Sequence, residues 1–260
     1  MTRRIIVCAD DYGQSPSVDD AIIDLIQKGR ICATTCLVQG PRWPQASQLL
    51  SHLSVDVGLH LDFTSNEVNT LPTSLRLPAI WTQCYLRMSQ KKVTQKLNIQ
   101  WDKFCQAMSR QPDFIDGHQH VHTLPVIRDA LLDLLYQNNF SGYLRSTFPM
   151  VNYPSAIKSQ IIALLGGRYW HKQLIRGCYQ YNQAFGGVYH FADFQHYRRY
   201  FQYWLKHLPD RSLIMCHPGL DIGSSLHHEY QYFMSQAYLD DLKRADVELS
   251  LGKKWIRSNK

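Results

Sequence analysis

The stretch RRIIVCADDYG, residues 3–13, is the strongest indication of the fold in this sequence. It opens with a β-branched, apolar run, which is typical of a strand buried in a parallel sheet. Residues 17–30 follow with apolar side chains at helical spacing, and Gly29 then favours the end of a helix. A strand followed directly by a helix is the unit from which parallel α/β sheets are built.

The same alternation continues along the chain. Further strands are expected at residues 31–40, 55–63, 113–122, 142–147, 211–219 and 247–251, and helices at 41–53, 87–108, 126–140, 191–208 and 236–245. Residues 64–82 are rich in Pro, Thr and Asn and indicate a long loop. No G-x-G-x-x-G follows the first strand, which favours a closed barrel over an open Rossmann sheet. We therefore predict a TIM-like (β/α) barrel, distorted or with fewer than eight strands, as one domain over residues 1–260, with an insertion or lid at 153–189.

Composition narrows the class of protein. Of the 260 residues, 45% are hydrophobic and 19% are charged, as in an ordinary globular protein. The net charge of +7 mildly favours anionic partners, but no Lys/Arg run resembles a nucleic-acid-binding arm. No apolar run approaches the length of a membrane span. The 7 cysteines are odd in number and contain no C-x-x-C, which favours a reducing, cytoplasmic compartment. A homodimer is left open.

Titratable residues stand at the ends of five of the expected strands. They are Asp10 and Asp11, then His60 and Asp62, then Asp116 and His118, then Arg145, and finally His217. A single Asp in such a place can be a simple turn residue, and a single His a structural one. A parallel fold, however, brings the carboxyl ends of its strands together, so these residues are expected to share one site.

The segment DGHQHVH, residues 116–122, is the densest of these groups. If the strand continues through it, His118, His120 and His122 lie on one face. A polar face at the mouth of a buried sheet is costly unless it binds something, which points to a metal or to catalysis.

Asp11, His60 and one of these histidines make a two-His, one-carboxylate set, which leaves coordination positions open for water and substrate. Adjacent strand residues point in different directions, so Asp10 would stay free as a base. His217, from another strand, is the candidate proton donor.

The sequence also resembles the YdjC-like carbohydrate deacetylases. The resemblance rests on ADDYG, TTCLVQG, GLHLDFT, DGHQHVH and CHPG, in that order, and it covers nearly the whole chain except residues 153–189. It implies a TIM-like barrel and hydrolysis of the N-acetyl group of an amino sugar. It also implies a divalent ion, commonly Mg²⁺ with Zn²⁺ as the alternative, held by Asp11, His60 and His118. His120, His122, Asp62 and Asp116 would then line the pocket, and Asp116 would accept a hydrogen bond from a histidine.

The resulting mechanistic hypothesis gives each remaining residue a role. Asp10 takes a proton from the attacking water, Arg145 pairs with Asp10, and His217 protonates the departing amine with Asp221 as its orienting partner. Sugar rings are expected to stack on aromatic residues of the irregular stretches, namely Trp81, Tyr85, Tyr179, Tyr181 and Phe185. Two other functions remain open at this point. One is a metal-dependent phosphoesterase, which often needs a second metal site, and the other is a non-catalytic sugar-binding protein.

Overall fold

A computed structural model describes residues 2–63, 89–151 and 153–257. Within these ranges a 9-stranded, all-parallel sheet has the order β6-β5-β4-β3-β2-β1-β8-β7, and β9 pairs with β1. The strands are β1 (Arg3–Tyr12), β2 (Ala33–Cys36), β3 (Asp56–Leu61), β4 (Phe114–Gly117), β5 (Tyr143–Leu144), β6 (Gln180–Tyr181), β7 (Phe185–Gly186), β8 (Ser212–Cys216) and β9 (Val247–Leu249). The expected loop at 64–82 lies outside the described residues.

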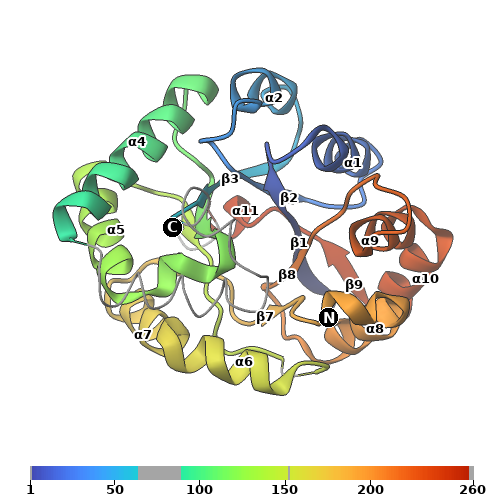
Figure 1. Ribbon diagram of the computed structural model, residues 1–260. Coiled ribbons are helices and arrows are strands. Elements are labelled where there is room, and N and C mark those ends of the chain that lie inside the picture. Colours follow the sequence, from blue (N-terminus) through green and yellow to red (C-terminus); the bar gives the residue numbers. More distant parts are fainter. Residues whose placement is uncertain (1, 64–88, 152, 258–260) are drawn as a thin grey trace.

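Helices surround the sheet on its outer side (Figure 1). They are α1 (Pro16–Gln27), α2 (Trp43–Leu50), α4 (Gln90–Met108), α5 (Pro125–Gln137), α6 (Ala156–Ile162), α7 (Arg168–Arg176), α8 (Tyr197–His207), α9 (Ser225–Met234) and α10 (Gln236–Arg244). A further helix, α11 (Lys253–Arg257), is not part of this ring. Short non-α turns form η1 (His118–Thr123), η2 (Ala163–Gly167) and η3 (Phe191–His196). None of the described helices combines the length and the apolar character that crossing a bilayer requires. The predicted distorted (β/α) barrel is confirmed.

The alternation of side chains along the strands builds two apolar layers. In β1, Ile5 and Val7 join the helices in the outer layer, whereas Ile6 and Cys8 face the barrel interior. All four are fully buried. Because both faces of the strand are covered, its sequence is a continuous apolar run rather than an alternating one. The interior layer ends at Cys8, and the next inward position on β1 is Asp10.

The barrel is closed by one bent segment, residues 180–186. Its first part, β6, pairs with β5, and its second part, β7, pairs with β8. Between them the buried Asn182 side chain accepts from the Ser146 backbone N–H (2.8 Å) and donates to the carbonyls of Ser146 (2.8 Å) and Ala184 (2.9 Å). Residues 153–189, expected to be an insertion or a lid, therefore supply part of the barrel wall.

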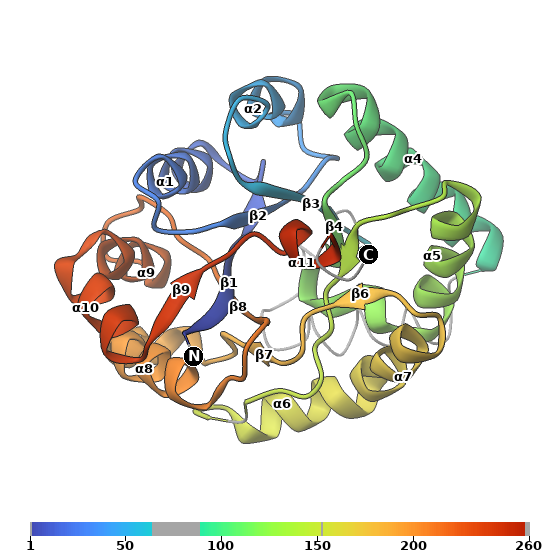
Figure 2. The ribbon, with the colours of Figure 1, turned by 180° about the vertical axis from the view of Figure 1, so that it is seen from behind.

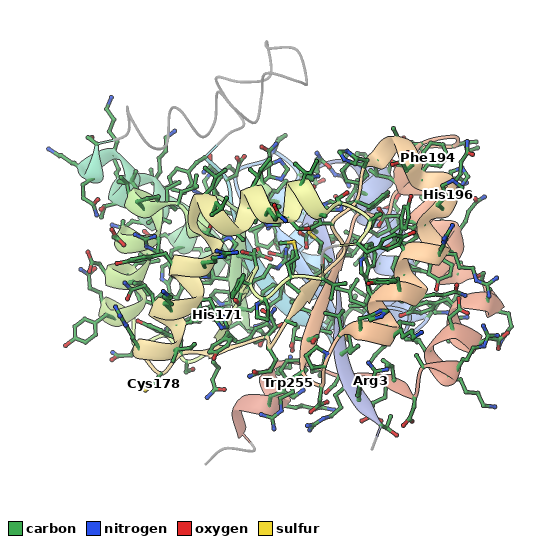
Figure 3. All side chains as sticks on the ribbon, turned by 90° about the horizontal axis from the view of Figure 1, so that it is seen from below. Arg3, His171, Cys178, Phe194, His196 and Trp255 are labelled. Carbon is green, nitrogen blue, oxygen red and sulfur yellow. The ribbon has the colours of Figure 1, made fainter. Side chains whose placement is uncertain are left out.

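The last described helix, α11, lies across the amino-terminal end of the barrel (Figure 2). Trp255 is 5% exposed and belongs to the interior layer. The Lys253 ammonium lies 3.3 Å from Asp56 Oδ1, which ties the helix to β3. Trp255 and Arg3 lie at this end, and Phe194 and His196 at the opposite one (Figure 3). One end of the barrel is thus plugged, and the carboxyl ends of the strands meet at the other.

Candidate active site

A bulge in β1 positions its two carboxylates. Ala9 pairs with Thr34 and Tyr12 with Cys36, so β1 has an extra residue between these pairs. Asp11 adopts φ 69°, a left-handed conformation. Bulges re-aim side chains at the ends of strands. Here Asp10 and Asp11 both reach the same inner cluster, although the simple alternation assumed from the sequence would send them to opposite faces.

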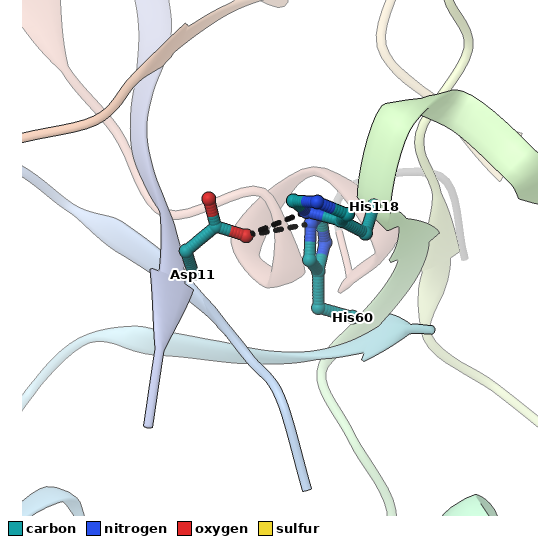
Figure 4. Close-up of side chains that lie close together, drawn as sticks. All are labelled: Asp11, His60 and His118. Carbon is teal, nitrogen blue, oxygen red and sulfur yellow. Dashed lines mark hydrogen bonds and ion pairs between the residues drawn. The ribbon is translucent and has the colours of Figure 1, made fainter. Parts of the chain in front are cut away.

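Asp11, His60 and His118 converge at the end of the barrel where the carboxyl ends of the strands meet (Figure 4). Asp11 Oδ1 lies 2.9 Å from His118 Nδ1 and 3.3 Å from His60 Nε2. The potential ligand atoms of the three residues all lie within 4.8 Å of one another. Asp11 and His60 are buried, and the His118 side chain is 25% exposed, so the group faces the open end of the barrel.

Asp116 fixes the orientation of His60. Its Oδ1 lies 2.6 Å from His60 Nδ1, and the two residues are paired in the β3–β4 register. Because Nδ1 is held by Asp116, the other ring nitrogen of His60, Nε2, faces Asp11. A carboxylate behind a histidine is the usual outer partner of a metal-binding histidine. The donor set of one carboxylate and two imidazoles also suits a catalytic divalent cation, so these residues fit the implied metal.

Arg145 joins Asp10 to Asp116. Its Nη1 and Nη2 donate to the two carboxylate oxygens of Asp10 at 2.6 Å each, and Nη2 lies 2.7 Å from Asp116 Oδ2. Arg145 and Asp116 are fully buried and Asp10 nearly so. The side chains of Cys8, Asp10 and Asp116 form a second acidic group, but the guanidinium already binds both of its carboxylates.

The charges of the cluster shift its pKa values in the metal-free protein. Burial opposes a charged ring, but Asp116 and Asp11 outweigh it and raise the pKa of His60 to about 10. For Asp11, burial is likewise outweighed, and His118 and His60 hold its pKa well below the usual range. Burial also works against the charged Asp116, yet Arg145 and His60 lower the pKa of its carboxyl to about 2. The carboxylates thus favour positive charge at this site, either as protons on the two histidines or as a bound cation.

The histidine run does not form the expected strand face. β4 ends at Gly117, and residues 118–123 form the turn η1, in which Gln119 (φ 52°) and His120 (φ 62°) are left-handed. The backbone therefore turns away, and the three histidines separate. His120 packs edge-on against Phe185, with ring centres 5.6 Å apart, and His122 Nε2 lies 3.1 Å from the Arg145 carbonyl. Burial lowers the pKa of His122 to about 4 and that of His120 well below its usual range.

His217 follows β8, beside the end of β1. Cys216 is paired with Ala9, the last pair between β8 and β1. His217 and Asp10 are the residues that follow this pair on the two neighbouring strands. The backbone N–H of His217 donates to the buried Glu229 at 2.7 Å, a partner that sequence reasoning missed. Asp221 instead accepts from Ser17 at 2.7 Å, so its expected contact with His217 does not form. Glu229 lies in α9, and no feature of the surrounding sequence distinguishes it from a glutamate on the protein surface.

Several expected pocket residues lie elsewhere. Tyr179 and Tyr181 line a cavity of about 90 Å³ with Trp255, at the plugged end of the barrel. Trp81 and Tyr85 lie outside the described residues. Phe191, which the sequence did not single out, packs edge-on against His217 with ring centres 5.3 Å apart and is 42% exposed.

Two other expected residues lie near the cluster. Phe185 packs inside the barrel, with its ring centre 5.8 Å from the Arg145 guanidinium carbon. Asp62 follows β3 directly and is buried, and its backbone N–H and carbonyl both bind the Gln100 side chain of α4, at 2.8 and 3.1 Å. Gln100 is fully buried and was not predicted from the sequence.

The barrel resembles solved structures over nearly its full length. A crystal structure of an Enterococcus faecalis V583 protein, whose name refers to cellobiose-phosphate cleavage, matches with a TM-score of 0.71 at 18% identity and covers 98% of this chain and 99% of that chain. A family 4 carbohydrate esterase from Streptomyces lividans, in complex with acetate, matches with a TM-score of 0.54 at 8% identity, covering 96% and 92% of the two chains. At these identities the likeness establishes the fold.

The comparisons at the level of sequence identify the family. A chitooligosaccharide deacetylase from Citrobacter koseri is 28% identical over 134 residues, which are 49% of this chain and 53% of that protein. The match thus spans about half the length of that relative. The family model of the YdjC-like proteins matches residues 4–244, which include every residue of the cluster described above. The chain therefore belongs to the YdjC-like protein family.

Proposed function

We propose that this protein is a metal-dependent carbohydrate deacetylase that removes N-acetyl groups from an amino sugar or a short N-acetylated oligosaccharide. The observation that carries the proposal is that two neighbouring carboxylates, Asp10 and Asp11, have different surroundings. Asp11 faces two imidazoles, as a metal ligand would, whereas Asp10 is held by a guanidinium beside it. The name of the Citrobacter koseri relative supports the same activity.

Asp11, His60 and His118 would hold the divalent cation, Mg²⁺ or Zn²⁺. When bound, such an ion supplies Lewis acidity toward the amide carbonyl and the attacking water.

Asp10 is the general base of the proposal. Its Oδ2 accepts one bond, from Arg145 Nη1, and a carboxylate oxygen can accept two. Oδ2 is therefore the atom that takes the proton of the attacking water. The bidentate contact with Arg145 keeps the carboxylate from turning away from the substrate.

His217 is the general acid of the proposal. It stands next to Asp10 on the neighbouring strand, and Glu229 and Phe191 hold its backbone and its ring. The ring delivers a proton to the nitrogen of the sugar as the C–N bond breaks, because an amide anion is a very poor leaving group. The partly exposed Phe191 offers a face on which the sugar ring can stack.

The phosphoesterase alternative is less well supported. Two-metal phosphoesterases need ligands for a second ion about 3.5–4 Å from the first ion. The second acidic group found among the described residues consists of Cys8, Asp10 and Asp116, and the Arg145 guanidinium already binds both of its carboxylates. A reducing, cytoplasmic setting remains part of the proposal, because the six described cysteines are free thiols.

Acetate release from a panel of N-acetylated sugars tests the proposal. The protein is stripped with a chelator and then reloaded with Mg²⁺ or Zn²⁺, and activity should return only with metal. Asp10→Asn keeps the size of the side chain but removes the base, so it should lower the rate on the order of 10²–10⁴-fold. Asp20→Asn, on the exposed face of α1, is the matched control and should leave the rate unchanged. Failure of the metal-loaded protein to release acetate from any member of the panel would contradict the proposal.

A further inference from the structure

Thr35 lies behind the proposed metal ligands. Its hydroxyl donates to Asp116 Oδ1 at 2.7 Å, and the same oxygen accepts from His60 Nδ1 at 2.6 Å. Thr35 is fully buried, as is Asp116. Thr35, His60 and Asp116 stand on the adjacent strands β2, β3 and β4, and all three side chains meet on the inner side of the sheet.

The buried Asp116 carboxylate depends on its neutral donor, the Thr35 hydroxyl, as well as on Arg145 and His60. Its Oδ2 faces Arg145 Nη2 at 2.7 Å, and its Oδ1 is shared by Thr35 and His60. A carboxylate in a dry interior is stable only when its oxygens are bound. Arg145 attracts the carboxylate toward Asp10, and Thr35 is the donor that holds Oδ1 on the side of His60.

We propose that Thr35 is a positioning residue for the metal centre. By fixing the rotation of the Asp116 carboxylate, it sets the direction of the His60 ring, so that Nε2 faces Asp11 and the cation. The inference rests on the metal centre of the proposed function. It makes Thr35 a determinant of metal affinity, although its hydroxyl contacts none of the three ligands directly.

The neighbouring Thr34 provides a matched control. It is equally buried and on the same strand, but its hydroxyl donates to the carbonyl of Ala9 at 2.9 Å. Replacing either threonine by valine removes one buried hydroxyl with little change of shape. Only the change at Thr35 removes a bond to Asp116.

Calorimetric titration of the metal-stripped protein with Zn²⁺ or Mg²⁺ alone tests the inference. Loss of the outer partner of a metal ligand typically weakens metal binding about 10–100-fold. Thr35 acts one contact further out, through Asp116, so Thr35→Val is expected to weaken binding by about 10-fold, the lower end of that range. Thr34→Val should bind the metal as the unchanged protein does. Thr35→Ser, which restores the hydroxyl, should recover most of the affinity, whereas Thr35→Ala should not.

The outcomes separate the inference from the proposal beneath it. Equal metal affinity of Thr35→Val and the unchanged protein would overturn the role of Thr35 and leave the metal centre intact. Equal weakening by Thr34→Val would show a general effect of strand packing and would likewise overturn that role. If Thr35→Val does not fold, the ratio of affinities between Thr35→Ser and Thr35→Ala decides in its place. Absence of metal binding by the unchanged protein would overturn the metal centre and the inference together.

Discussion

Arg145 binds Asp10 through two parallel hydrogen bonds of 2.6 Å, and the same guanidinium lies 2.7 Å from Asp116. One buried positive charge thus stands between two buried carboxylates. The excess negative charge reaches His60 through Asp116 and contributes to its raised pKa. The proposed base and the proposed metal ligands are therefore parts of one electrostatic unit.

Replacing Arg145 by methionine should destabilise the fold strongly. The change leaves the carboxylates of Asp10 and Asp116 buried without their cation, and breaking a buried pair in this way costs about 3–5 kcal/mol. The free energy of unfolding in urea measures it. Arg4→Met is the control, because the Arg4–Asp210 pair is more than a third exposed on both sides, and exposed pairs contribute about 0–1 kcal/mol. Similar losses for the two variants would contradict this account.

Metal content should depend on His60 and His118 and not on His120. His60→Ala and His118→Ala each remove one of the three side chains that converge on the proposed cation position, whereas His120 packs against Phe185. Elemental analysis of the purified variants at neutral pH measures the bound metal. Full occupancy in His118→Ala would move the ligand assignment to another histidine.

The metal-free protein should lose stability as the pH rises from about 6.5 to about 10. The pKa of His60 is about 10 in the folded state and 6.5 in its unperturbed state, so folding favours the protonated ring. This stabilisation is complete below pH 6.5 and disappears as the pH passes through the folded pKa. Urea unfolding in chelator across this range measures the effect. The corresponding slope should be smaller in His60→Gln, and parallel curves for the two proteins would refute the role of His60.

His217→Ala should slow deacetylation more than it slows hydrolysis of an activated ester. An amine must be protonated as it leaves, whereas an aryl oxide departs without a proton. The loss should appear in kcat rather than in KM, because the proton is transferred only during reaction. Rates on an N-acetyl sugar and on an aryl acetate are compared in the same variant. An equal loss on both substrates would mean that His217 supports the fold or binding instead.

The sequence was sufficient to locate the residues at the ends of strands. Asp11 and His60 follow apolar runs that are legible as strands, and a parallel fold then requires them to meet. Arg145 was predicted to pair with Asp10, and the structure brings the two together. These inferences needed only the order of the elements.

The remaining features depend on information that a sequence pattern does not contain. The turn after Gly117 rests on left-handed Gln119 and His120. Both are non-glycine residues, which adopt that conformation only rarely, even though histidine is enriched in it. Strands β6 and β7 have two residues each, too few to show a period. Glu229 is 12 residues beyond the His217 backbone that it binds, and only tertiary packing brings it there.

The bent segment 180–186 also determines how the barrel can deform. In a barrel whose strands are hydrogen-bonded all the way round, an outward movement is spread over every strand pair. Here the circumference has a seam at residues 180–186, where the side-chain amide of Asn182 takes the place of some of the backbone hydrogen bonds between strands. Phe185, three residues beyond Asn182, packs against both the His120 ring and the Arg145 guanidinium and so forms part of the floor of the pocket. Because Phe185 is itself paired with Leu213 of β8, the floor of the pocket cannot move outward at the seam without loosening that strand pair.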